Sequence, residues 1–353
     1  MAPVVLVEDL RVRFTTPDTV VHAVNGISFT LEPGRVLGIL GESGSGKSVT
    51  LRALIGLLPP RRSHVDGRIV VGGHEITRMS ERELRDVRGT RIAMVFQEPT
   101  TALDPVFTIG EQIAETIVRH EGISHPEAYR RALELLEMVQ IPSATRRLKS
   151  YPHEMSGGMR QRAMIALALS CRPTVLLADE PTTALDVTVQ IQIIVLLRQL
   201  QQDLGMAVVF VTHDVGVAVE VADRIAVMYA GRFVETGLAE AVIRSPAHPY
   251  TAGLLASTVL GAARGQRLEA IPGSPPDMTA LPTGCSFAPR CRFAEPRCRD
   301  ALPAEFALAS DRTVRCIRVA AGEIDVAAGT PNGDAVVGWQ RRAMEEPARG
   351  TAR

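Results

Sequence analysis

The sequence predicts an α/β fold, and three observations support that prediction. Residues 41–48 read Gly-Glu-Ser-Gly-Ser-Gly-Lys-Ser and match the phosphate-loop pattern G-x-x-x-x-G-K-[ST] at every defined position. The apolar run Val36–Leu40 precedes this loop, and the helix-forming stretch Val49–Leu58 follows it. Further compact apolar runs alternate with segments of helical periodicity, as buried parallel strands do. Strands alternating with helices around a phosphate loop indicate an α/β core.

The remaining elements follow in an order that fits this fold class. Residues 3–31 alternate apolar and polar side chains with turn residues between them, which predicts antiparallel strands before the loop. The charged segment 80–88 and the periodic segments 108–140 and 156–170 are expected to be helical. The other expected strands are the apolar runs 92–96, 174–178 and 207–211.

The phosphate loop carries the most specific chemistry in the chain. Its backbone amides, with the positive end of the following helix behind them, would point at phosphate oxygens. Lys47 would reach the β- and γ-phosphates, and the Ser48 hydroxyl would bind Mg²⁺. The sequence therefore predicts a nucleotide site at Gly41–Ser48.

Polar residues follow three of the expected strands. Asp179 and Glu180 come directly after an apolar run, where the first acid commonly supports Mg²⁺ and the second can activate an attacking water. Gln97 follows another strand, where its neutral amide could contact the metal or the water. His213 follows a third, where it could donate to the γ-phosphate.

Size and composition set further limits. A chain of 353 residues, 46% of them hydrophobic, can bury a sizeable core, which excludes a mainly disordered protein. Basic and acidic residues balance at 39 each, so no net field attracts nucleic acid or anionic lipid. No apolar stretch approaches the roughly 18–20 residues that span a bilayer, and the N-terminus does not resemble a secretory signal. We expect a soluble, intracellular protein unless a partner holds it at a membrane.

A second anion site is predicted at residues 155–162, which read Met-Ser-Gly-Gly-Met-Arg-Gln-Arg. Ser156 would N-cap a helix whose first amides are exposed beside two glycines. The chain has one phosphate loop but two such helix ends. A head-to-tail dimer explains this pairing, because each Ser-Gly-Gly helix can close over the nucleotide bound by its partner.

With these motifs in place, the sequence resembles the ATP-binding subunits of ABC transporters over roughly residues 4–245. The resemblance implies a P-loop NTPase fold of ABC type, in which a mixed sheet core carries an antiparallel β subdomain and a helical subdomain at about 98–160. Met155 and Met159 replace the leucine and glutamine of the general Leu-Ser-Gly-Gly-Gln form but leave the serine and glycines intact. The motifs in family order are the phosphate loop, Gln97, Ser156-Gly157-Gly158, Asp179-Glu180, Ala184-Leu185-Asp186 and His213.

The same resemblance implies catalytic roles for matching residues. Glu180 would be the general base and His213 the switch histidine, while Lys47 would hold the phosphates. Gln97 would contact Mg²⁺ beside Ser48 and link the site to the membrane subunit. The full set expected to bind ATP and Mg²⁺ is Phe14, Gly41, Ser43, Gly44, Ser45, Gly46, Lys47, Ser48, Val49, Gln97, Ser156, Gly157, Gly158, Asp179 and Asp186.

Four of these residues have more particular expected roles. Ser156 and Gly158 would contact the γ-phosphate held by the opposite subunit. Asp186 would touch the partner across the interface. Phe14 is the candidate for stacking on adenine, where the family usually has an aromatic residue.

A narrower similarity points to the oligopeptide/dipeptide/nickel importer branch. It rests on the runs 151–162 and 178–190, on Ser245-Pro-Ala-His-Pro-Tyr250, and on a cysteine-containing extension. The implied domains are an ABC nucleotide-binding domain at 1–245, an oligopeptide-transporter-type extension at 246–318 and a flexible tail at 319–353.

Cysteine usage is uneven. Cys171 stands alone in an apolar helical stretch, which is typical of a buried structural thiol. Four others cluster near the C-terminus, and in an intracellular chain such a cluster favours a metal or iron–sulfur site over disulfides. The resemblance implies a [4Fe–4S] centre with a structural role, and tetrahedral zinc and free thiols remain the alternatives. The four are Cys285, Cys291, Cys298 and Cys316.

The function expected from these observations is that of the ATPase of a peptide-type ABC importer. Its partners would be two membrane-spanning permease subunits, a second ATP-binding subunit that is either related or identical, and an extracytoplasmic solute-binding protein. It would lie peripherally at the cytoplasmic face of the plasma membrane. The alternatives are a soluble ABC ATPase acting on nucleic acid or ribosomes, and an iron–sulfur redox-sensing module that only binds nucleotide.

Overall fold

The computed structural model describes residues 2–183, 185–258, 270–309 and 311–327. These residues form two compact units, each built from discontinuous segments. The first unit comprises the described residues up to 12, together with 26–36 and 48–211. The second comprises 13–25, 37–47 and the described residues from 212 onward. Most of the tail expected at 319–353 lies outside the described residues, because the description ends at 327.

The first unit holds most of a four-stranded sheet whose order is β2-β1-β4-β5. The strands expected within residues 3–31 are present as β1 (Val5–Thr15) and β2 (Val20–Leu31). The sequence did not predict β4 (Ser63–Val71) or its partner β5 (His74–Glu75). Most of β4 is exposed or half-buried, so it lacks the apolar alternation by which a strand is recognised.

Three parallel strands in the first unit bring the predicted polar residues to one edge. β6 (Ile92–Val95), β7 (Val175–Asp179) and β8 (Ala207–Thr212) lie side by side and are completely buried. Their register pairs Val95 with Ala178 and Ala178 with Phe210. Parallel strands end at a common edge, and the residues after β6 and β7 therefore meet there.

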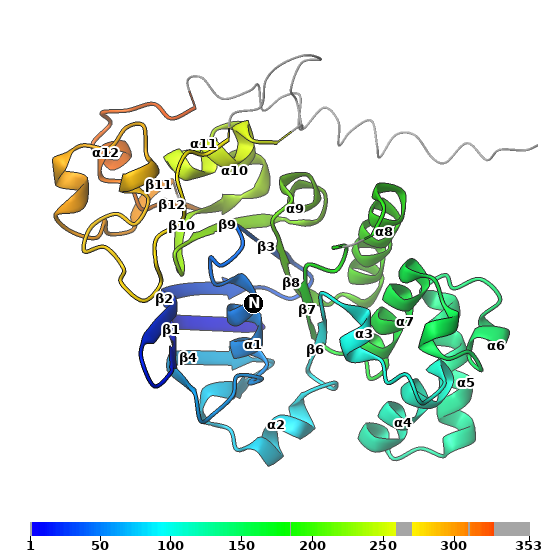
Figure 1. Cartoon of the computed structure of the whole chain (residues 1–353). Coiled ribbons are helices and arrows are strands. Elements are labelled where there is room, and N and C mark those ends of the chain that lie inside the picture. Colours follow the sequence, from blue (N-terminus) through cyan, green and yellow to red (C-terminus); the bar gives the residue numbers. More distant parts are fainter. Residues whose placement is uncertain (1, 184, 259–269, 310, 328–353) are drawn as a thin grey trace, which may run out of the picture. The chain divides into compact units, whose positions relative to one another are not determined.

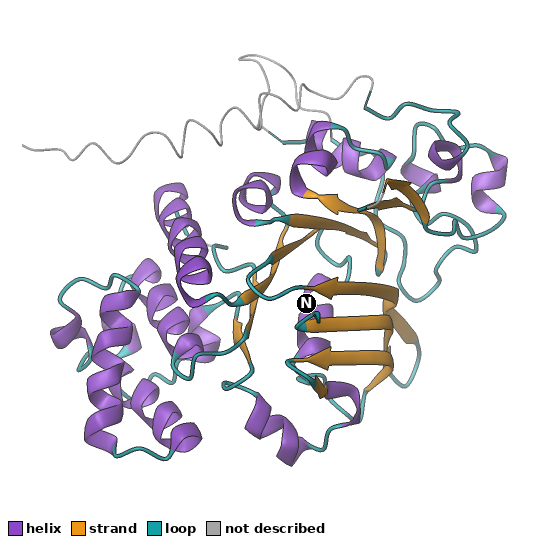
Figure 2. Cartoon of the chain, turned by 180° about the vertical axis from the view of Figure 1, so that it is seen from behind, coloured by secondary structure: helices purple, strands orange, loops and turns teal. Residues whose placement is uncertain are grey.

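Helices α3 to α7 form one helical part within the first unit (Figure 1 and, from behind, Figure 2). Residues 108–140 form two helices rather than one, because Gly122 adopts a left-handed conformation with φ +69° and ends α4. Thr108 and Glu111 form a capping box at the start of α4. The helices are α3 (Pro99–Ala102), α4 (Ile109–Glu121), α5 (His125–Met138), α6 (Ala144–Arg147) and α7 (Gly157–Leu169).

In the second unit, the C-terminal segment extends the sheet of the nucleotide-binding region. β3 (Val36–Leu40) runs parallel to β9 (Arg224–Tyr229), and β10 (Arg232–Leu238) pairs antiparallel with β9. β12 (Arg312–Val314) then pairs with β10, and β11 (Phe306–Ala309) pairs with β12. The segment after residue 246 therefore adds two strands to the sheet beside β10.

The remaining helices complete the two units. Glu81–Val87 forms α2, and Ser80 and Glu83 form its capping box, in agreement with the helix expected at 80–88. The others are α1 (Lys47–Leu54), α8 (Val187–Leu204), α9 (Val215–Val221), α10 (Ala239–Arg244), α11 (Pro249–Ala256) and α12 (Ile317–Ala320).

A buried carboxylate ties the start of the C-terminal segment to β10. The side chain of Glu235 is 0% exposed; it accepts hydrogen bonds from the N–H groups of Ala247 and His248 and pairs with Arg312 at 2.6 Å. The two N–H groups lie just before α11, whereas Arg312 is the first residue of β12. The buried pair therefore organises both the turn before α11 and the strand β12.

Replacing Glu235 by alanine should lower the free energy of unfolding by about 3–5 kcal/mol, because it leaves the Arg312 charge and two N–H groups without their partner. Thermal denaturation measures the effect. The matched control is Glu240→Ala, which removes an exposed i,i+4 pair with Arg244 and should change stability by less than about 0.5 kcal/mol. Equal losses in both variants would contradict the role given to Glu235.

Candidate functional site

The phosphate loop follows the completely buried strand β3 and is shaped by close contacts with neighbouring backbone. A Cβ atom at Gly41 would lie 2.3 Å from the Met228 carbonyl oxygen. At Gly46, where φ is +106°, a Cβ atom would lie 2.4 Å from the Ala23 carbonyl oxygen. Only glycine fits either position, since real Cβ atoms do not approach backbone so closely. The strands β2 and β9 therefore fix the path of the loop.

Lys47 is the first residue of α1 and is 4% exposed. Its Nζ donates hydrogen bonds to the carbonyl oxygens of Gly41 (2.8 Å) and Glu42 (2.9 Å). The ammonium group therefore lies within the loop, beside the amides of the helix start. A buried cation next to the first amides of a helix is a suitable environment for a polyphosphate.

Ser48 and Asp179 are 131 residues apart in sequence and are in direct contact. The Ser48 hydroxyl donates to the Asp179 carboxylate at 2.7 Å, and Asp179, the last residue of β7, is 2% exposed. Hydroxyl and carboxylate oxygens are the hard ligands that Mg²⁺ prefers, and Mg²⁺ takes its other ligands from phosphate and water. The pair fits the expected magnesium position.

Glu180 has a left-handed backbone conformation with φ +45°, which is unusual for a residue other than glycine. Its N–H donates to the Val211 carbonyl oxygen of β8 at 3.0 Å, which holds this conformation in place. Its carboxylate accepts hydrogen bonds from the Thr183 hydroxyl (2.9 Å) and the Gln97 amide (3.5 Å). Strained residues held by their surroundings are concentrated at functional sites. The structure thus brings Gln97 and Glu180 together.

Thr183 is a site residue that the sequence analysis missed. It lies in the run that follows Glu180, but a threonine in a turn is more often a local backbone partner. The signal that could have found it was the three-residue spacing to Glu180, which allows the hydroxyl to reach back to the carboxylate.

For several predicted site residues, the structure gives a position in the fold and an exposure. His213 is exposed and directly follows β8, and Asp214 after it caps α9 by accepting from two N–H groups. Phe14 is half-buried near the end of β1. Ser43 is exposed in the loop, and Val49 is half-buried in α1. The roles given to these residues remain predictions.

The Ser-Gly-Gly motif begins α7 as expected. The Ser156 hydroxyl accepts from the Met159 N–H at 3.3 Å, while Met155 before it is buried and anchors the turn. A Cβ atom at Gly158 would lie 2.6 Å from Cγ1 of Val189, in the first turn of α8. Asp186 caps α8 by accepting from the Val189 N–H at 3.0 Å. The starts of α7 and α8 therefore pack directly on each other; Ala184 lies outside the described residues.

This contact gives a specific prediction. Gly158→Ala should lower the melting temperature of the protein, because overpacking a close contact costs about 1–3 kcal/mol. Gly157→Ala should not lower it, since the nearest atom there is 3.5 Å away. Adding Val189→Ala to Gly158→Ala should restore stability. Calorimetry of the four proteins checks this, and a failure of the double variant to recover would contradict the packing argument.

The four C-terminal cysteines line one small cavity of about 20 Å³. Burial raises the pKa of the Cys285 and Cys316 thiols and raises that of Cys291 to about 11. However, within the ranges that the structure describes, no three or more His, Cys, Asp or Glu side chains are arranged as ligands of a metal ion. The predicted metal centre is therefore not supported by the structure, although the thiol donor set suits one. Cys171, expected to be buried, is half-buried between α4 and α7.

Comparisons with known proteins decide the family. Residues 24–183 match the family model described as "ABC transporter". The oligopeptide transport ATP-binding protein OppD of Salmonella typhimurium is 49% identical over 299 residues, which cover 85% of this chain and 89% of that protein. The chain belongs to the family of ABC transporter ATP-binding subunits. It is accordingly an ATPase that uses ATP and Mg²⁺.

Further similarities specify the branch of this subunit. Residues 234–298 match the C-terminal region of oligopeptide/dipeptide transporters. The dipeptide transport ATP-binding protein DppD of Bacillus subtilis is 46% identical over 90% of this chain and 95% of its own length. A dimeric ATP-binding cassette bound to ADP and phosphate matches with a TM-score of 0.60 and 30% identity, over 67% of this chain and 98% of that one. These findings confirm the predicted ABC-type fold.

Across the described ranges, no helix combines the length and apolar character needed to cross a membrane.

Proposed function

We propose that this subunit hydrolyses ATP to power the import of peptides through an ABC transporter. The observation that carries the proposal is the grouping of Ser48, Asp179, Glu180 and Gln97 through direct hydrogen bonds. The relatives named for oligopeptide and dipeptide transport support peptides as the substrate class. The similarity to each relative extends over most of this chain and most of the relative, including the C-terminal segment.

In this proposal each site residue has one role. Lys47 and the loop amides bind the β- and γ-phosphates, and Ser48 with Asp179 holds Mg²⁺. Glu180 is the general base, because its carboxylate is held by Gln97 and Thr183 in a fixed orientation. His213 donates to the γ-phosphate. Phe14 stacks on adenine.

The chain has one phosphate loop and one Ser-Gly-Gly helix, so a complete site requires a second ATP-binding subunit. Ser156, Gly157 and Gly158 would contact the γ-phosphate bound by that partner, and Asp186 would lie at the interface. The dimeric cassette bound to ADP and phosphate supports this arrangement, since 98% of the cassette matches 67% of this chain. Co-expression with each candidate chain distinguishes an identical partner from a related one.

The permease subunits are proposed to dock on the helical part at about 98–160. Val106 and Phe107 are 72% and 52% exposed, in the stretch between α3 and α4 that follows Gln97 in the chain. Exposed apolar side chains in the same part of the chain as Gln97 are suited to receive a membrane partner. The subunit would thus lie peripherally at the cytoplasmic face of the plasma membrane, with an extracytoplasmic solute-binding protein supplying substrate. The proposed division is 1–245 for the nucleotide-binding domain and 246–318 for the extension.

The test is co-expression with two permease subunits and a second ATP-binding subunit. The proposal expects the chain to sediment with membranes only in their presence, and its ATPase activity to rise when a peptide-loaded binding protein is added. Sedimentation with ribosomes or nucleic acid instead, without any response to peptide, would favour the soluble ATPase. ATP binding with no hydrolysis in the full complex would favour the nucleotide-binding redox module.

We further propose that the four C-terminal thiols bind a single metal centre of structural function. All four line one cavity, and the Cys₄ donor set suits a [4Fe–4S] cluster or zinc. A bound centre would cross-link a segment whose secondary structure is short. Anaerobic purification followed by iron, sulfide and zinc analysis tests this proposal. About four irons per chain indicates the cluster, one zinc indicates the ion, and neither element in stoichiometric amount would contradict both.

A further inference from the structure

Glu42 is the second residue of the phosphate loop, and the C-terminal segment binds it at two points. Its backbone N–H donates to the Tyr250 hydroxyl at 2.9 Å. Its carboxylate accepts two hydrogen bonds from the Arg290 guanidinium, at 2.7 and 3.0 Å. A bidentate pair between an arginine and a carboxylate is among the stronger and more directional contacts in proteins. Both partners belong to the segment that matches oligopeptide/dipeptide transporters rather than to the ATP-binding motifs.

Tyr250 is held in place by the Ser245–Tyr250 motif. Glu235 fixes the turn before it through the N–H groups of Ala247 and His248. The completely buried His248 then accepts from the Tyr250 N–H through Nδ1 at 3.1 Å, and burial lowers its pKa to about 3, so this nitrogen is available as an acceptor. Tyr250 is 0% exposed. Its hydroxyl therefore has a fixed position against the loop.

The side chain of Arg290 is also held in place by its surroundings. Its side chain is 5% exposed, while that of Glu42 is 28% exposed, so the pair is largely shielded from water. Arg290 also donates through Nε to the Pro272 carbonyl oxygen at 2.9 Å and lies 5.9 Å from the ring centre of Tyr229. Tyr229 directly follows Met228, whose carbonyl group packs against Gly41. The guanidinium thus lies beside the same strand end that shapes the loop.

The contacts at Glu42 continue to Lys47. The Glu42 carbonyl oxygen accepts from Lys47 Nζ, so Glu42 is held by Tyr250 at its N–H, by Arg290 at its side chain and by Lys47 at its carbonyl. A shift of Glu42 would move an acceptor of the phosphate-binding ammonium. Fixing a binding loop before the ligand arrives reduces the ordering cost of binding.

We propose that Tyr250 and Arg290 are positioning residues for ATP binding, by which the C-terminal segment holds the phosphate loop in its binding shape through Glu42. Both side chains bind Glu42 of the phosphate loop, so the effect falls on nucleotide affinity rather than on the chemical step. The inference rests on ATP binding by the loop. It does not depend on which solute is transported.

The first test is binding of a fluorescent ATP analogue to the full-length chain. Arg290→Gln and Glu42→Gln should each raise the dissociation constant about tenfold, and the double variant should raise it no further, because both remove one interaction. Tyr250→Phe should raise it several-fold. Arg290→Lys should recover part of the affinity. If the effects of Arg290→Gln and Glu42→Gln on the dissociation constant are additive in the double variant, the proposal is overturned.

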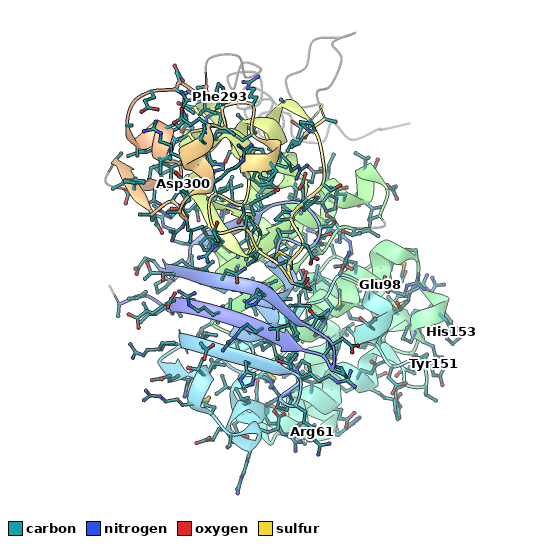
Figure 3. The ribbon with its side chains drawn as sticks, turned by 60° about the vertical axis from the view of Figure 1, so that its left-hand side comes forward. Arg61, Glu98, Tyr151, His153, Phe293 and Asp300 are labelled. Carbon is teal, nitrogen blue, oxygen red and sulfur yellow. The ribbon has the colours of Figure 1, made fainter. Side chains whose placement is uncertain are left out.

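The matched control is Arg292→Gln, two residues from Arg290. Arg292 is exposed, and its guanidinium lies 4.8 Å from the ring centre of Phe293, which is labelled in Figure 3. This variant should bind the analogue like the original chain. For the Tyr250 hydroxyl, the corresponding control is Tyr129→Phe on α5.

A second measurement separates positioning from general destabilisation. Hydrogen exchange of peptides spanning residues 36–47 should accelerate in Arg290→Gln at temperatures where the protein remains folded, and ATPase assays of the assembled complex should show a higher KM with kcat nearly unchanged. A lower melting temperature with unchanged exchange, KM and affinity would assign Arg290 a purely structural role and overturn the proposal. If the changes in exchange, KM and affinity are observed but peptide does not stimulate the ATPase of the original complex, only the proposal of peptide transport is contradicted.

Discussion

Replacing Glu180 by glutamine should lower ATPase turnover about 10²–10⁴-fold, the usual contribution of a general base. The amide keeps the size of the side chain and its hydrogen bonds to Gln97 and Thr183, but it cannot accept a proton from water. ATP affinity should be retained, because the phosphates are bound by the loop and Lys47. Turnover is measured in the assembled complex, with nucleotide binding determined in parallel.

The control for this variant is Thr183→Val, which removes the hydroxyl that holds the carboxylate but leaves the carboxylate itself. Its turnover should fall much less than that of Glu180→Gln. Because the partner subunit could hydrolyse ATP at its own site, both variants are assayed with a partner whose corresponding glutamate is also replaced by glutamine. Undiminished turnover in that complex would show that Glu180 is not the base.

Replacing Lys47 by methionine should weaken ATP binding by about 10- to 200-fold, since a hydrogen bond to a charged group contributes about 1.5–3 kcal/mol. Methionine preserves the apolar stem within the loop and removes only the charge. Lys47 is 4% exposed and bonded to two loop carbonyls, so its removal also weakens the loop itself. Equilibrium binding of ATP measures the loss.

The sequence supplies a direct control for Lys47, because the chain contains only one other lysine, Lys149. Lys149 is exposed after α6, and Lys149→Met should leave ATP affinity unchanged. The same pair allows a labelling test with an amine reagent. ATP should protect Lys47 and not Lys149, and equal reaction of both lysines in the presence of ATP would contradict the placement of Lys47 at the phosphates.

The motifs that could be predicted are those whose chemistry is local. The phosphate loop, the Ser156 cap of α7 and the acids after β7 each depend on residues within a few positions of one another. The contact between Gln97 and Glu180 was not predicted, although both residues follow expected strands and parallel strands end at one edge of a sheet.

The features that were missed depend on contacts distant in sequence or on misleading patterns. Residues 187–193 alternate apolar and polar side chains in the manner of a strand, yet they begin α8. The helix forms because Asp186 caps it and because Ile193, Leu197 and Leu200 bury one face. The strands β11 and β12 are short; β12 pairs with β10, about 80 residues earlier in the chain, and β11 pairs with β12. Nothing local to Glu42 indicates its pairing with Arg290, 248 residues later.

Uptake of a labelled peptide into proteoliposomes tests the central claim most directly. The vesicles contain the permease subunits, both ATP-binding subunits and enclosed ATP, with the loaded binding protein outside. The account predicts uptake with the original chain and its loss with Glu180→Gln, while the complex remains assembled. Assembly and ATP hydrolysis by the original chain without uptake of any peptide, or full uptake with Glu180→Gln in both subunits, would contradict it.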